Sequence, residues 1–251
     1  MFNLAPVPVP DLSGKTILVT GAGKGIGAAL VRILQAKGAV VYAGVYAAEP
    51  DEDLPTGVTV MPLDVTRQAD VDAVVARITA EQGRLDVLVN NAGLITPIGP
   101  LADLASDALT PAFAVNVIGV HRLCTSCLPL LRASGGTIVN AGTGAATTPM
   151  EGWTAYCTSK AAMRMLTQMM AMELAPLKAF FIGIPPTDTA MQGKIRQAGL
   201  NPISKIPQDK LVPAEVPASV MAWLCSDAAR SVNEVLLDVR QDRFTAMMDL
   251  G

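Results

Sequence analysis

The sequence predicts an α/β fold in which helices cover both faces of a doubly wound, seven-stranded parallel sheet. The first observation is that short runs of β-branched and other apolar residues alternate with segments of helical periodicity along the chain. The second is that these runs are apolar at nearly every position, which is typical of strands buried on both faces of a parallel sheet. Ligands of such folds bind at the carboxyl ends of the strands, so we expect the functional site there.

Each predicted strand is one of these apolar runs. In chain order the strands cover residues 15–21, 39–45, 57–65, 85–93, 136–142, 178–184 and 234–239. Helices are expected where apolar residues recur at spacings of three and four. They cover residues 25–38, 68–83, about 110–132 and 156 to about 174, and Gly38 closes the first.

The chain has 251 residues, which suits one large domain, and 51% of them are hydrophobic, which supplies a large buried core. We expect this domain to cover residues 13–251 and to follow an extended arm, residues 1–12, with proline at positions 6, 8 and 10. The arm has no basic segment followed by an apolar one, so it is not expected to be a secretory signal. The proline-rich segment 200–213 is expected to form a mobile loop over the end of the sheet.

Charge and hydropathy argue against two classes of partner. The formal net charge is −3 and the 19 basic residues are scattered, so neither nucleic acid nor an anionic membrane surface is expected as a partner. No run of 18 or more apolar residues occurs, so no membrane-spanning segment is expected.

Cys124 and Cys127 form a C-x-x-C pair, a spacing found in redox and zinc sites. Here they lie in an apolar helical segment, where a spacing of three places both thiols on one helix face. His121 is the only histidine, so nothing completes a metal site. We expect these two cysteines, with Cys157 and Cys225, to be reduced thiols of a cytoplasmic protein that binds no metal.

The sequence TGAGKGIG, residues 20–27, follows the first predicted strand and begins the first predicted helix. In this context Gly21 permits a tight turn, Gly25 lets the backbone approach a pyrophosphate, and Gly27 lets the helix pack closely on the strand. Backbone N–H groups of this loop, including that of Ile26, and the positive end of the helix dipole attract phosphate groups. The segment therefore predicts a dinucleotide-binding site rather than an ordinary tight turn.

Two features bear on the choice between NAD and NADP. An acid at the end of the second strand would bind the adenosine ribose hydroxyls of NAD, but Val45 is followed there by Tyr46, which is expected to border the cofactor. Lys24 lies inside the phosphate loop, where its ammonium group can meet the 2′-phosphate of NADP. The sequence therefore favours NADP(H) over NAD(H). Acids just downstream oppose this preference if they fold inward: Glu49, Asp51, Glu52 and Asp53.

From about residue 15 to about residue 239, the chain resembles the short-chain dehydrogenase/reductase family. The motifs that carry the resemblance are TGAGKGIG (20–27), LDV (63–65), NNAG (90–93), the asparagine of FAVNVIG (Asn116) and YCTSK (156–160). Their order and spacing together make it specific. The resemblance implies a single-domain Rossmann fold, a nicotinamide cofactor, and alcohols or carbonyl compounds as substrates.

The resemblance also implies which residues bind the cofactor. Asp64 and Val65 are expected to contact the adenine. Thr189, in TDTAMQ, matches the threonine that meets the carboxamide or the phosphates. The residues expected to line the cofactor after the fourth strand are Asn90, Ala92 and Gly93.

By the same resemblance, Tyr156 is the general acid and base that protonates a carbonyl oxygen or deprotonates an alcohol. The pKa of free tyrosine is near ~10, and lowering it by two to three units requires roughly 3–4 kcal/mol. Lys160, one helical turn further on, lies on the same helix face, and its charge favours the phenolate, as an oxidised nicotinamide does. Lys160 is also implied to hold the nicotinamide ribose, and Asn116 to bind a water that links Lys160 to solvent.

Two of the places where the sequence departs from the family lie at the predicted site. Gly142 and Thr143 stand where the family has two serines, the second of them thirteen residues before the tyrosine. The Thr143 hydroxyl can donate the same hydrogen bond to a substrate oxygen, while its methyl group narrows the pocket. After the sixth strand, Pro185-Pro186 replaces Pro-Gly and removes a backbone donor near the nicotinamide.

We therefore expect a cytoplasmic NADP(H)-dependent carbonyl reductase or alcohol dehydrogenase acting on a small molecule. The segments PPTDTAMQGKIR (185–196) and YCTSKAAMRML (156–166) show a fainter resemblance to the sepiapterin- and benzil-reductase branch, which reduces dicarbonyls. One alternative is an NAD-dependent alcohol dehydrogenase, which tighter binding of NADH would favour. Another is a regulatory or scaffold protein with weakened catalysis, which would follow if the departures have disabled the site.

The helix that carries Tyr156 also predicts an assembly. It has five methionines on more than one helix face, so they cannot all face the sheet. Family members pair this helix across a two-fold axis, so a homodimer or homotetramer is expected. The methionines are Met163, Met165, Met169, Met170 and Met172.

Overall fold

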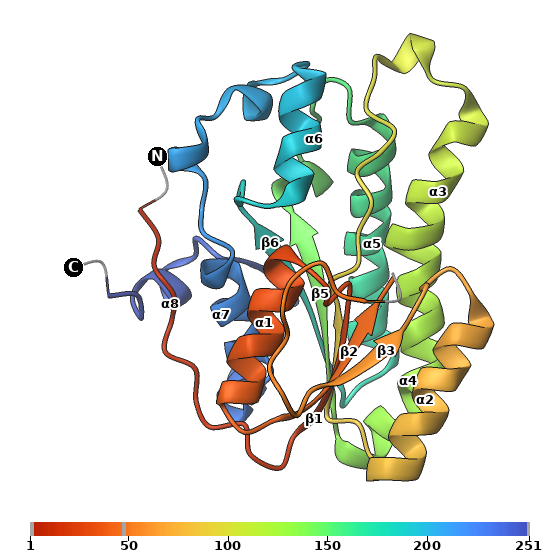
Figure 1. Cartoon of the computed structure of the whole chain (residues 1–251), viewed down its shortest axis with the longest axis vertical. Helices are drawn as coiled ribbons and strands as arrows, with labels where there is room; N and C mark the ends of the chain where they lie inside the picture. The colour runs from red at the N-terminus through yellow and green to blue at the C-terminus, as the bar shows by residue number, and fades with distance from the viewer. Residues whose placement is uncertain (1–2, 47–48, 250–251) are drawn as a thin grey trace.

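The computed structural model describes residues 3–46 and 49–249, in which seven strands form one parallel sheet. The strand order is β3-β2-β1-β4-β5-β6-β7, and every neighbouring pair is parallel. The predicted doubly wound sheet is confirmed (Figure 1), and the order reverses between β1 and β4, where such sheets bind ligands. The strands are β1 (Thr16–Thr20), β2 (Val40–Val45), β3 (Thr59–Pro62), β4 (Val87–Asn90), β5 (Thr137–Thr143), β6 (Lys178–Ile184) and β7 (Leu236–Asp238).

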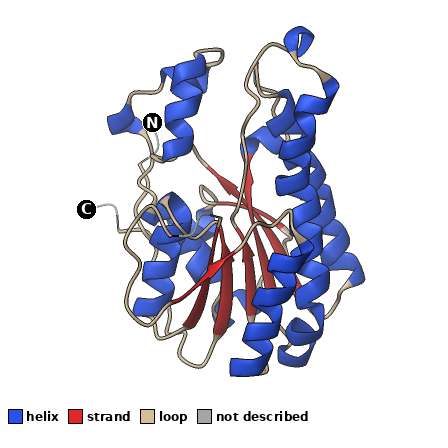
Figure 2. Cartoon of the chain, turned by 45° about the vertical axis from the view of Figure 1, so that its right-hand side comes forward, coloured by secondary structure: helices blue, strands red, loops and turns tan. Residues whose placement is uncertain are grey.

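Helices cover both faces of the sheet, as Figure 2 shows. One hydrophobic core lies between the sheet and α1, α7 and α8, and a second lies between the sheet and α2, α4 and α5. The helices are α1 (Gly25–Ala36), α2 (Gln68–Gln82), α3 (Thr110–Phe113), α4 (Val120–Ser134), α5 (Thr154–Glu173), α6 (Ala190–Ala198), α7 (Glu215–Leu224) and α8 (Asp242–Thr245).

The central strand β1 shows why the strands are apolar throughout. Ile17 and Val19 belong to the core beneath α1, whereas Leu18, between them, belongs to the core beneath α4. All three side chains are fully buried. Because successive side chains of a strand point to opposite faces, a strand that is covered on both faces needs an apolar residue at every position.

The sequence predicted all seven strands, but three of them are shorter than expected by three residues or more. The segments 57–65 and 85–93 contain β3 and β4, whose ladders stop three residues earlier, and the segment 234–239 contains β7, which begins two residues later and ends one residue earlier. The residues left over after β3 and β4 include the LDV and NNAG motifs. These motifs therefore lie beyond the ends of the strands, where the candidate site opens.

Helices α6, α7 and α8 were not predicted. Eight of the ten residues of α7 are buried, so this helix has no polar face to give a helical period. The proline-rich segment 200–213, expected to be a mobile loop, contains two 3₁₀ turns (Pro202–Lys205 and Gln208–Lys210). A backbone bridge from Thr187 to Val212 fixes this segment to the chain that follows β6.

The predicted helix at about 110–132 is continuous from Thr110 to Ser134. It begins as α3, passes through a π-helical turn, η3 (Ala114–Gly119), and continues as α4. By length and composition, the run Ser106–Ser134 is apolar enough to cross a membrane. In this fold its Leu123, Cys127 and Leu131 are buried against the sheet, so it is a core helix of the α/β domain.

The N-terminal arm is extended, as predicted, and it packs on the domain. Val7, Val9 and Leu12 are buried in the same core as α1 and α7. The Val7 N–H donates a hydrogen bond of 2.9 Å to Oγ of Ser219. The arm therefore shares the core of the domain that it precedes.

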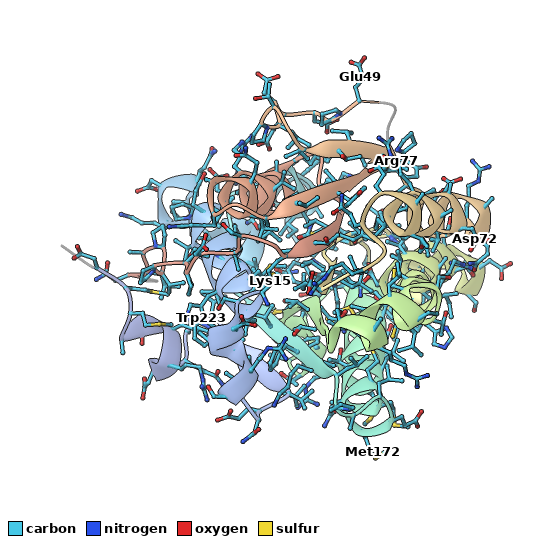
Figure 3. The ribbon with its side chains drawn as sticks, turned by 90° about the horizontal axis from the view of Figure 1, so that it is seen from below. Lys15, Glu49, Asp72, Arg77, Met172 and Trp223 are labelled. Carbon is cyan, nitrogen blue, oxygen red and sulfur yellow. The ribbon has the colours of Figure 1, made fainter. Side chains whose placement is uncertain are left out.

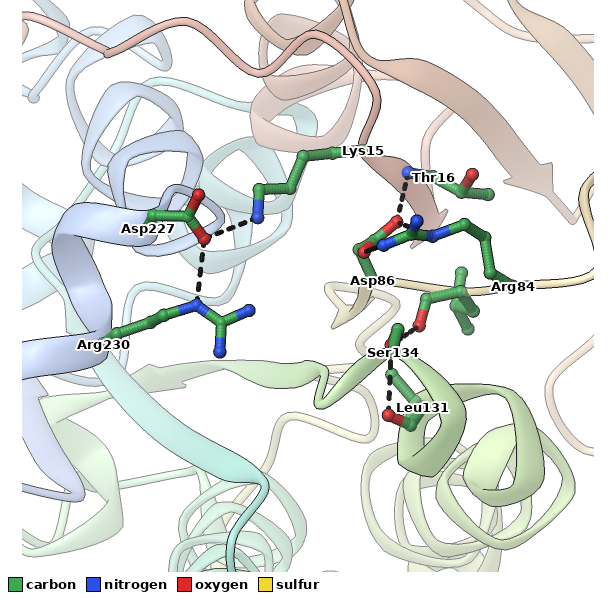
Figure 4. A network of polar contacts seen from close by, with 9 residues as sticks. Lys15, Thr16, Arg84, Asp86, Leu131, Ser134, Asp227 and Arg230 are labelled. Atoms are coloured by element: carbon green, nitrogen blue, oxygen red, sulfur yellow. Dashed lines mark hydrogen bonds and ion pairs between the residues drawn. The ribbon is translucent and has the colours of Figure 1, made fainter.

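Ion pairs fix the end of the sheet that lies opposite the site (Figures 3 and 4). Asp227 accepts from Lys15, at 2.7 Å, and from Arg230, at 2.9 Å. The buried carboxylate of Asp86 accepts from the N–H of Thr16 at 2.8 Å and pairs with Arg84. The contact of Asp86 with Thr16 holds together the starts of β1 and β4, the two strands between which the site opens, and the contact of Asp227 with Lys15 ties the start of β1 to the turn Asp227–Ser231.

Candidate active site

A cavity of about 1200 Å³ opens at the carboxyl ends of the central strands. Sites for one small ligand measure about 300–1,000 Å³, so this cavity has room for a dinucleotide and a small substrate together. It brings together fourteen of the predicted site residues. They are Gly21, Lys24, Gly25, Ile26, Gly27, Tyr46, Asp64, Val65, Ala92, Gly93, Thr143, Tyr156, Lys160 and Thr189.

The backbone itself requires the glycines of the phosphate loop. Gly21 and Gly25 have φ angles of +61° and +55°, which side-chain-bearing residues rarely adopt. A β-carbon on Gly21 would lie 2.8 Å from Cα of Ala92, and one on Gly27 would overlap the carbonyl oxygen of Gly21. A β-carbon on Gly25 would lie 3.2 Å from Cγ2 of Thr189, so Thr189 faces the loop. The loop thus presents backbone and the start of α1 to a phosphate group, and it fits a dinucleotide.

The adenosine side of the cavity is formed by residues that follow β2 and β3. Tyr46 lies at the rim and is 79% exposed, while Asp64 and Val65 lie deeper. The carboxylate of Asp64 accepts from both the N–H and the hydroxyl of Thr66, at 2.9 and 2.7 Å. Asp64 is therefore held in one orientation beside the cavity, where a planar base can lie against Val65.

Asn90 does not line the cavity, so its predicted contact with the cofactor is wrong. It is the last residue of β4, and Nδ2 of its buried side chain donates a hydrogen bond of 2.8 Å to Oδ1 of Asn140 on β5. The next residue, Asn91, lines the cavity instead, and its Nδ2 donates to the carbonyl oxygens of Thr20 and Gly21, at 3.1 and 3.0 Å. Adjacent residues at the end of a strand point in opposite directions, so the position at which the ladder stops decides which asparagine faces the ligand.

Helix α5 places Tyr156 and Lys160 on one face, both almost fully buried. The Lys160 ammonium donates a hydrogen bond of 2.8 Å to the carbonyl oxygen of Ala141 on β5, and it lies 5.9 Å from the centre of the Tyr156 ring. Thr143 ends β5, and its Oγ1 accepts 3.2 Å from the N–H of Ala145. Strand β5 therefore positions both the lysine and the threonine next to the phenol.

Burial shifts the pKa values of this pair in opposite directions. It raises the pKa of Tyr156 to about 12, an effect that the neighbouring Thr143 side chain partly offsets. It also lowers the pKa of Lys160 to about 8. In both cases the surrounding protein disfavours the charged form. At neutral pH the site therefore holds a neutral phenol, which is ready to donate its proton, beside a lysine whose charge is easily lost.

Asn116 is fully buried in the π-helical turn and does not line the cavity. Its Oδ1 accepts 2.8 Å from the N–H of Leu94, and its Nδ2 donates to the carbonyl oxygen of Leu94, at 2.8 Å, and to Oγ of Ser159, at 2.9 Å. Both amide donors are thus used within the protein, so a water at Asn116 would have to donate to one of its oxygens, and the predicted relay role stays a prediction. Asn116 is a positioning residue that ties the segment after β4 to α5.

An apolar wall encloses the substrate side of the cavity, and nearly all of its members come from the segments 94–100, 146–153 and 190–212, which the sequence predicts to be apolar pocket walls. Trp153 precedes Tyr156 by three residues, and the two rings meet edge to face, with centres 5.6 Å apart. The indole nitrogen of Trp153 is buried and has no hydrogen-bond partner within the described chain. The other apolar members of the wall are Ile95, Ala145, Met150, Met191, Ile195 and Ile203.

One of these two departures from the family, Gly142, has a structural explanation, and the other, Pro186, makes a backbone contact. A β-carbon on Gly142 would overlap the ring of Phe181, on the neighbouring strand β6. The carbonyl oxygen of Pro186 accepts 3.0 Å from the N–H of Val212. Phe181 thus fills the space of a side chain at position 142, and Pro186 joins the segment after β6 to the segment 200–213.

Lys24 lines the cavity as predicted, but its ammonium group is paired. It lies 2.5 Å from Oδ2 of Asp51, in the acidic segment that follows β2. That segment folds back over the phosphate loop, because the N–H of Glu52 donates 3.1 Å to the carbonyl oxygen of Gly23. The assumption that Lys24 is available for a 2′-phosphate therefore needs correction.

Comparisons with known proteins identify the family. Residues 15–199 match the family model described as short chain dehydrogenase. The chain is 36% identical to 2,3-dihydro-2,3-dihydroxybenzoate dehydrogenase of Escherichia coli (strain K12), over 88% of this chain and 94% of that protein. It is 33% identical to benzil reductase ((S)-benzoin forming) of Saccharomyces cerevisiae, over 84% and 90%.

Among solved structures, 3-ketoacyl-(acyl-carrier-protein) reductase from Brucella melitensis, complexed with NADH, matches with a TM-score of 0.82 and 26% identity. The match covers 93% of this chain and all of that one. The cavity with its Tyr156–Lys160 pair, the family match and these relatives lead to one conclusion: the chain belongs to the short-chain dehydrogenase family of NAD(P)-dependent oxidoreductases, which act on alcohol and carbonyl groups.

Proposed function

We propose that the protein interconverts a small carbonyl compound and its alcohol, with Tyr156 as the general acid and base. The observation that carries this proposal is the buried Tyr156–Lys160 pair beside Thr143, in the same cavity as the glycine loop. A bound nicotinamide dinucleotide supplies or accepts the hydride. The chain's own residues bind the substrate oxygen and move one proton to or from it.

In the reducing direction, the hydroxyl of Thr143 orients the substrate carbonyl and Tyr156 donates its proton to the oxygen. A phenol with a raised pKa holds this proton at neutral pH. The Lys160 ammonium, held by the carbonyl of Ala141, then stabilises the phenolate that remains. In the oxidising direction the same groups accept the alcohol proton, and the charge of Lys160 lowers the cost of forming phenolate.

We propose a largely apolar substrate with a flat ring. The wall around Trp153, Met150 and Met191 offers apolar and aromatic surface and few charges. Two relatives have names that point the same way, since one is a benzil reductase and the other acts on a dihydroxy derivative of dihydrobenzoate. An aromatic or alicyclic ketone, such as a diketone, is therefore the first class to test.

The cofactor is a nicotinamide dinucleotide, and the preference for NADP(H) favoured by the sequence depends on a free Lys24. Since Lys24 pairs with Asp51, that support is weakened. The remaining lining residues that we assign to the cofactor, from Gly21 to Thr189, suit either dinucleotide.

The test is turnover measured by nicotinamide absorbance, with NADH and with NADPH, on a panel of aromatic and alicyclic ketones and diketones. Turnover by the wild-type protein that falls about 10²-fold or more in Tyr156→Phe supports the proposal. Binding of a cofactor without turnover of any ketone or alcohol would favour the regulatory or scaffold alternative instead.

We also propose that the protein is a homodimer or homotetramer. Met165, Met169 and Met172 on α5, with Ile118 on the preceding long helix, are exposed apolar side chains on one pair of helices, and Figure 3 shows Met172 at the edge of the molecule. A second copy that covered them would remove apolar surface from water. Light scattering that finds only a 26.1 kDa species at micromolar concentration would contradict this assembly.

We propose the cytoplasm as the compartment in which the protein works. Its four cysteines are free thiols, and Cys124, Cys127 and Cys225 are buried in the cores. Free thiols persist in a reducing compartment. Export of the protein to an oxidising compartment in a cell-fractionation experiment would contradict this assignment.

A further inference from the structure

An acidic segment is fixed against the phosphate loop, whose residues Lys24 and Gly25 line the cavity. This segment, residues 49–53, follows β2 by a few residues. The N–H of Glu52 donates 3.1 Å to the carbonyl oxygen of Gly23, and Cα of Pro50 lies 3.3 Å from the place of a β-carbon on Gly23. The absence of a side chain at position 23 is what lets the segment lie so close to the loop.

Two carboxylates of this segment pair with two neighbouring cations, Lys24 of the phosphate loop and Arg32 of α1. Asp51 lies 2.5 Å from the ammonium of Lys24, and Oε2 of Glu52 lies 2.8 Å from the guanidinium of Arg32 on α1. The other oxygen of Glu52 accepts 2.5 Å from the N–H of Gly25, the first residue of α1. Glu52 therefore occupies the N–H of Gly25 and is held by three contacts, one to Gly23 of the loop and two to α1.

The charges beside the phosphate loop favour a neutral ligand group over an anionic one. The two cations are balanced by the carboxylates of Asp51 and Glu52, and Glu49 and Asp53 add two further negative charges. Burial raises the pKa of Glu52, but the hydrogen bond from Gly25 and the contact with Arg32 outweigh it, so the pKa is lowered overall. Glu52 therefore stays ionised at neutral pH.

The position of this cluster is the adenosine end of the cavity. Lys24, Gly25 and Tyr46 line the rim, and Asp64 lies next to it. In dinucleotide folds the group that binds the adenosine ribose comes from the end of the second strand, where this chain has Tyr46 and no acid. The segment 49–53, further along the chain, places carboxylates near this position instead.

We propose that Asp51 and Glu52 select the cofactor: they accept the adenosine ribose hydroxyls and mask Lys24 and Arg32, so that the protein prefers NAD(H). This inference rests on the proposed function, since it assumes that the cavity binds a nicotinamide dinucleotide. A carboxylate has about four acceptor positions, so Glu52 can take a ribose hydroxyl while it keeps its present partners. The 2′-phosphate of NADP(H) would lie beside both carboxylates, and their negative charges would repel it. Lys24 and Arg32 could not compensate, because both are already paired with these carboxylates. Without the two carboxylates, Lys24 and Arg32 become a latent site for the 2′-phosphate of NADP(H).

The test measures the dissociation constants of NADH and NADPH by calorimetry with the whole chain. The variant Asp51→Asn/Glu52→Gln removes the two charges and keeps the shape and one acceptor of each side chain. The control variant Glu49→Gln/Asp53→Asn removes two charges from the same segment, and Figure 3 shows Glu49 pointing away from the molecule. Thermal melts establish that both variants are folded.

We expect the wild type and the control to bind NADH about tenfold or more tightly than NADPH. The Asp51→Asn/Glu52→Gln variant is expected to gain about tenfold in NADPH affinity and to lose NADH affinity. Adding Lys24→Met to this variant should remove the gain. The inference is overturned if the wild type prefers NADPH, or if both double variants change NADPH affinity equally. If the wild type binds neither dinucleotide, the proposed function fails as well, which separates the two failures.

Discussion

Phe181 on β6 fills the space that a side chain at position 142 on β5 would need. A β-carbon on Gly142 would overlap two carbons of the Phe181 ring, which is itself buried in the core beneath α5. The two strands are neighbours, and Gly142 pairs with Gly183 in their ladder. The loss of a serine at position 142 is thus matched by an aromatic ring on the adjacent strand, while Thr143 keeps a hydroxyl at the cavity.

We predict that Gly142→Ser lowers the free energy of unfolding by about 1–3 kcal/mol, because the added side chain overpacks the core against Phe181. Phe181→Leu alone also destabilises, through lost packing. The double variant should be destabilised by less than the sum of the two single variants, since the smaller leucine makes room for the serine. Chemical denaturation of the four proteins measures this coupling, and strict additivity would contradict the contact.

Thr143→Val should lower kcat/KM about 10²–10³-fold, because it removes one hydrogen-bond donor to the substrate oxygen without changing the side-chain size. Thr143→Ser keeps the hydroxyl and is the matched control, with an expected loss of less than about tenfold. The Thr143 side chain also lowers the pKa of Tyr156 in part. The pH at which alcohol oxidation reaches half its maximum rate should therefore rise in the valine variant. An unchanged rate in Thr143→Val would exclude this role.

The buried lysine predicts a pH dependence of stability in the cofactor-free protein. The pKa of Lys160 falls from 10.5 to about 8 on folding, so between these values the unfolded chain binds more protons than the folded one. Stability from this residue therefore rises as the pH increases from 8 towards 10.5. Tyr156, whose pKa rises from 10.0 to about 12, acts in the opposite direction above pH 10.

The tyrosine contributes little below pH 10, so the effect of the lysine can be measured against Lys160→Met. The free energy of unfolding of the wild type, relative to that of the variant, should rise by about 2–3 kcal/mol from pH 7 to pH 10. Denaturation at several pH values measures the gain as a change in the difference between the two proteins. The absolute difference also contains the lost hydrogen bond to Ala141, so only its change with pH bears on the lysine charge. Curves that stay parallel across this range would contradict a lowered lysine pKa.

The parts of the site that the sequence predicted are those set by local chemistry. Gly21 and Gly25 need positive φ angles, and Gly27 needs close backbone contact. Each requirement restricts the residue type at its own position. The spacing of Tyr156 and Lys160 likewise fixes their common helix face once α5 forms. The seven strands were predictable for a related reason, since burial on both faces requires apolar residues throughout.

The parts that were wrong depend on contacts between distant segments. Asn90 and Asn91 have the same side chain, and only the end of the β4 ladder decides which one faces the cavity. Lys24 was expected to meet a 2′-phosphate, yet it pairs with Asp51, which lies 27 residues further along the chain. Helix α7 has no periodic pattern because it is buried on nearly all sides. No local pattern in the sequence encodes these arrangements.

Asn116→Ala provides a test of positioning against proton relay. The change removes three hydrogen bonds that join Leu94 and Ser159, so we expect the free energy of unfolding to fall by about 2–4 kcal/mol. Ser159→Ala removes one of the three and should cost about 1 kcal/mol. If Asn116 acts by position, activity should fall in both variants in the order of their stability losses, because both loosen the contact between α5 and the segment after β4. Denaturation and kcat are measured for the wild type and both variants. If the Asn116 variant loses turnover but keeps wild-type stability, the residue acts in a proton relay instead.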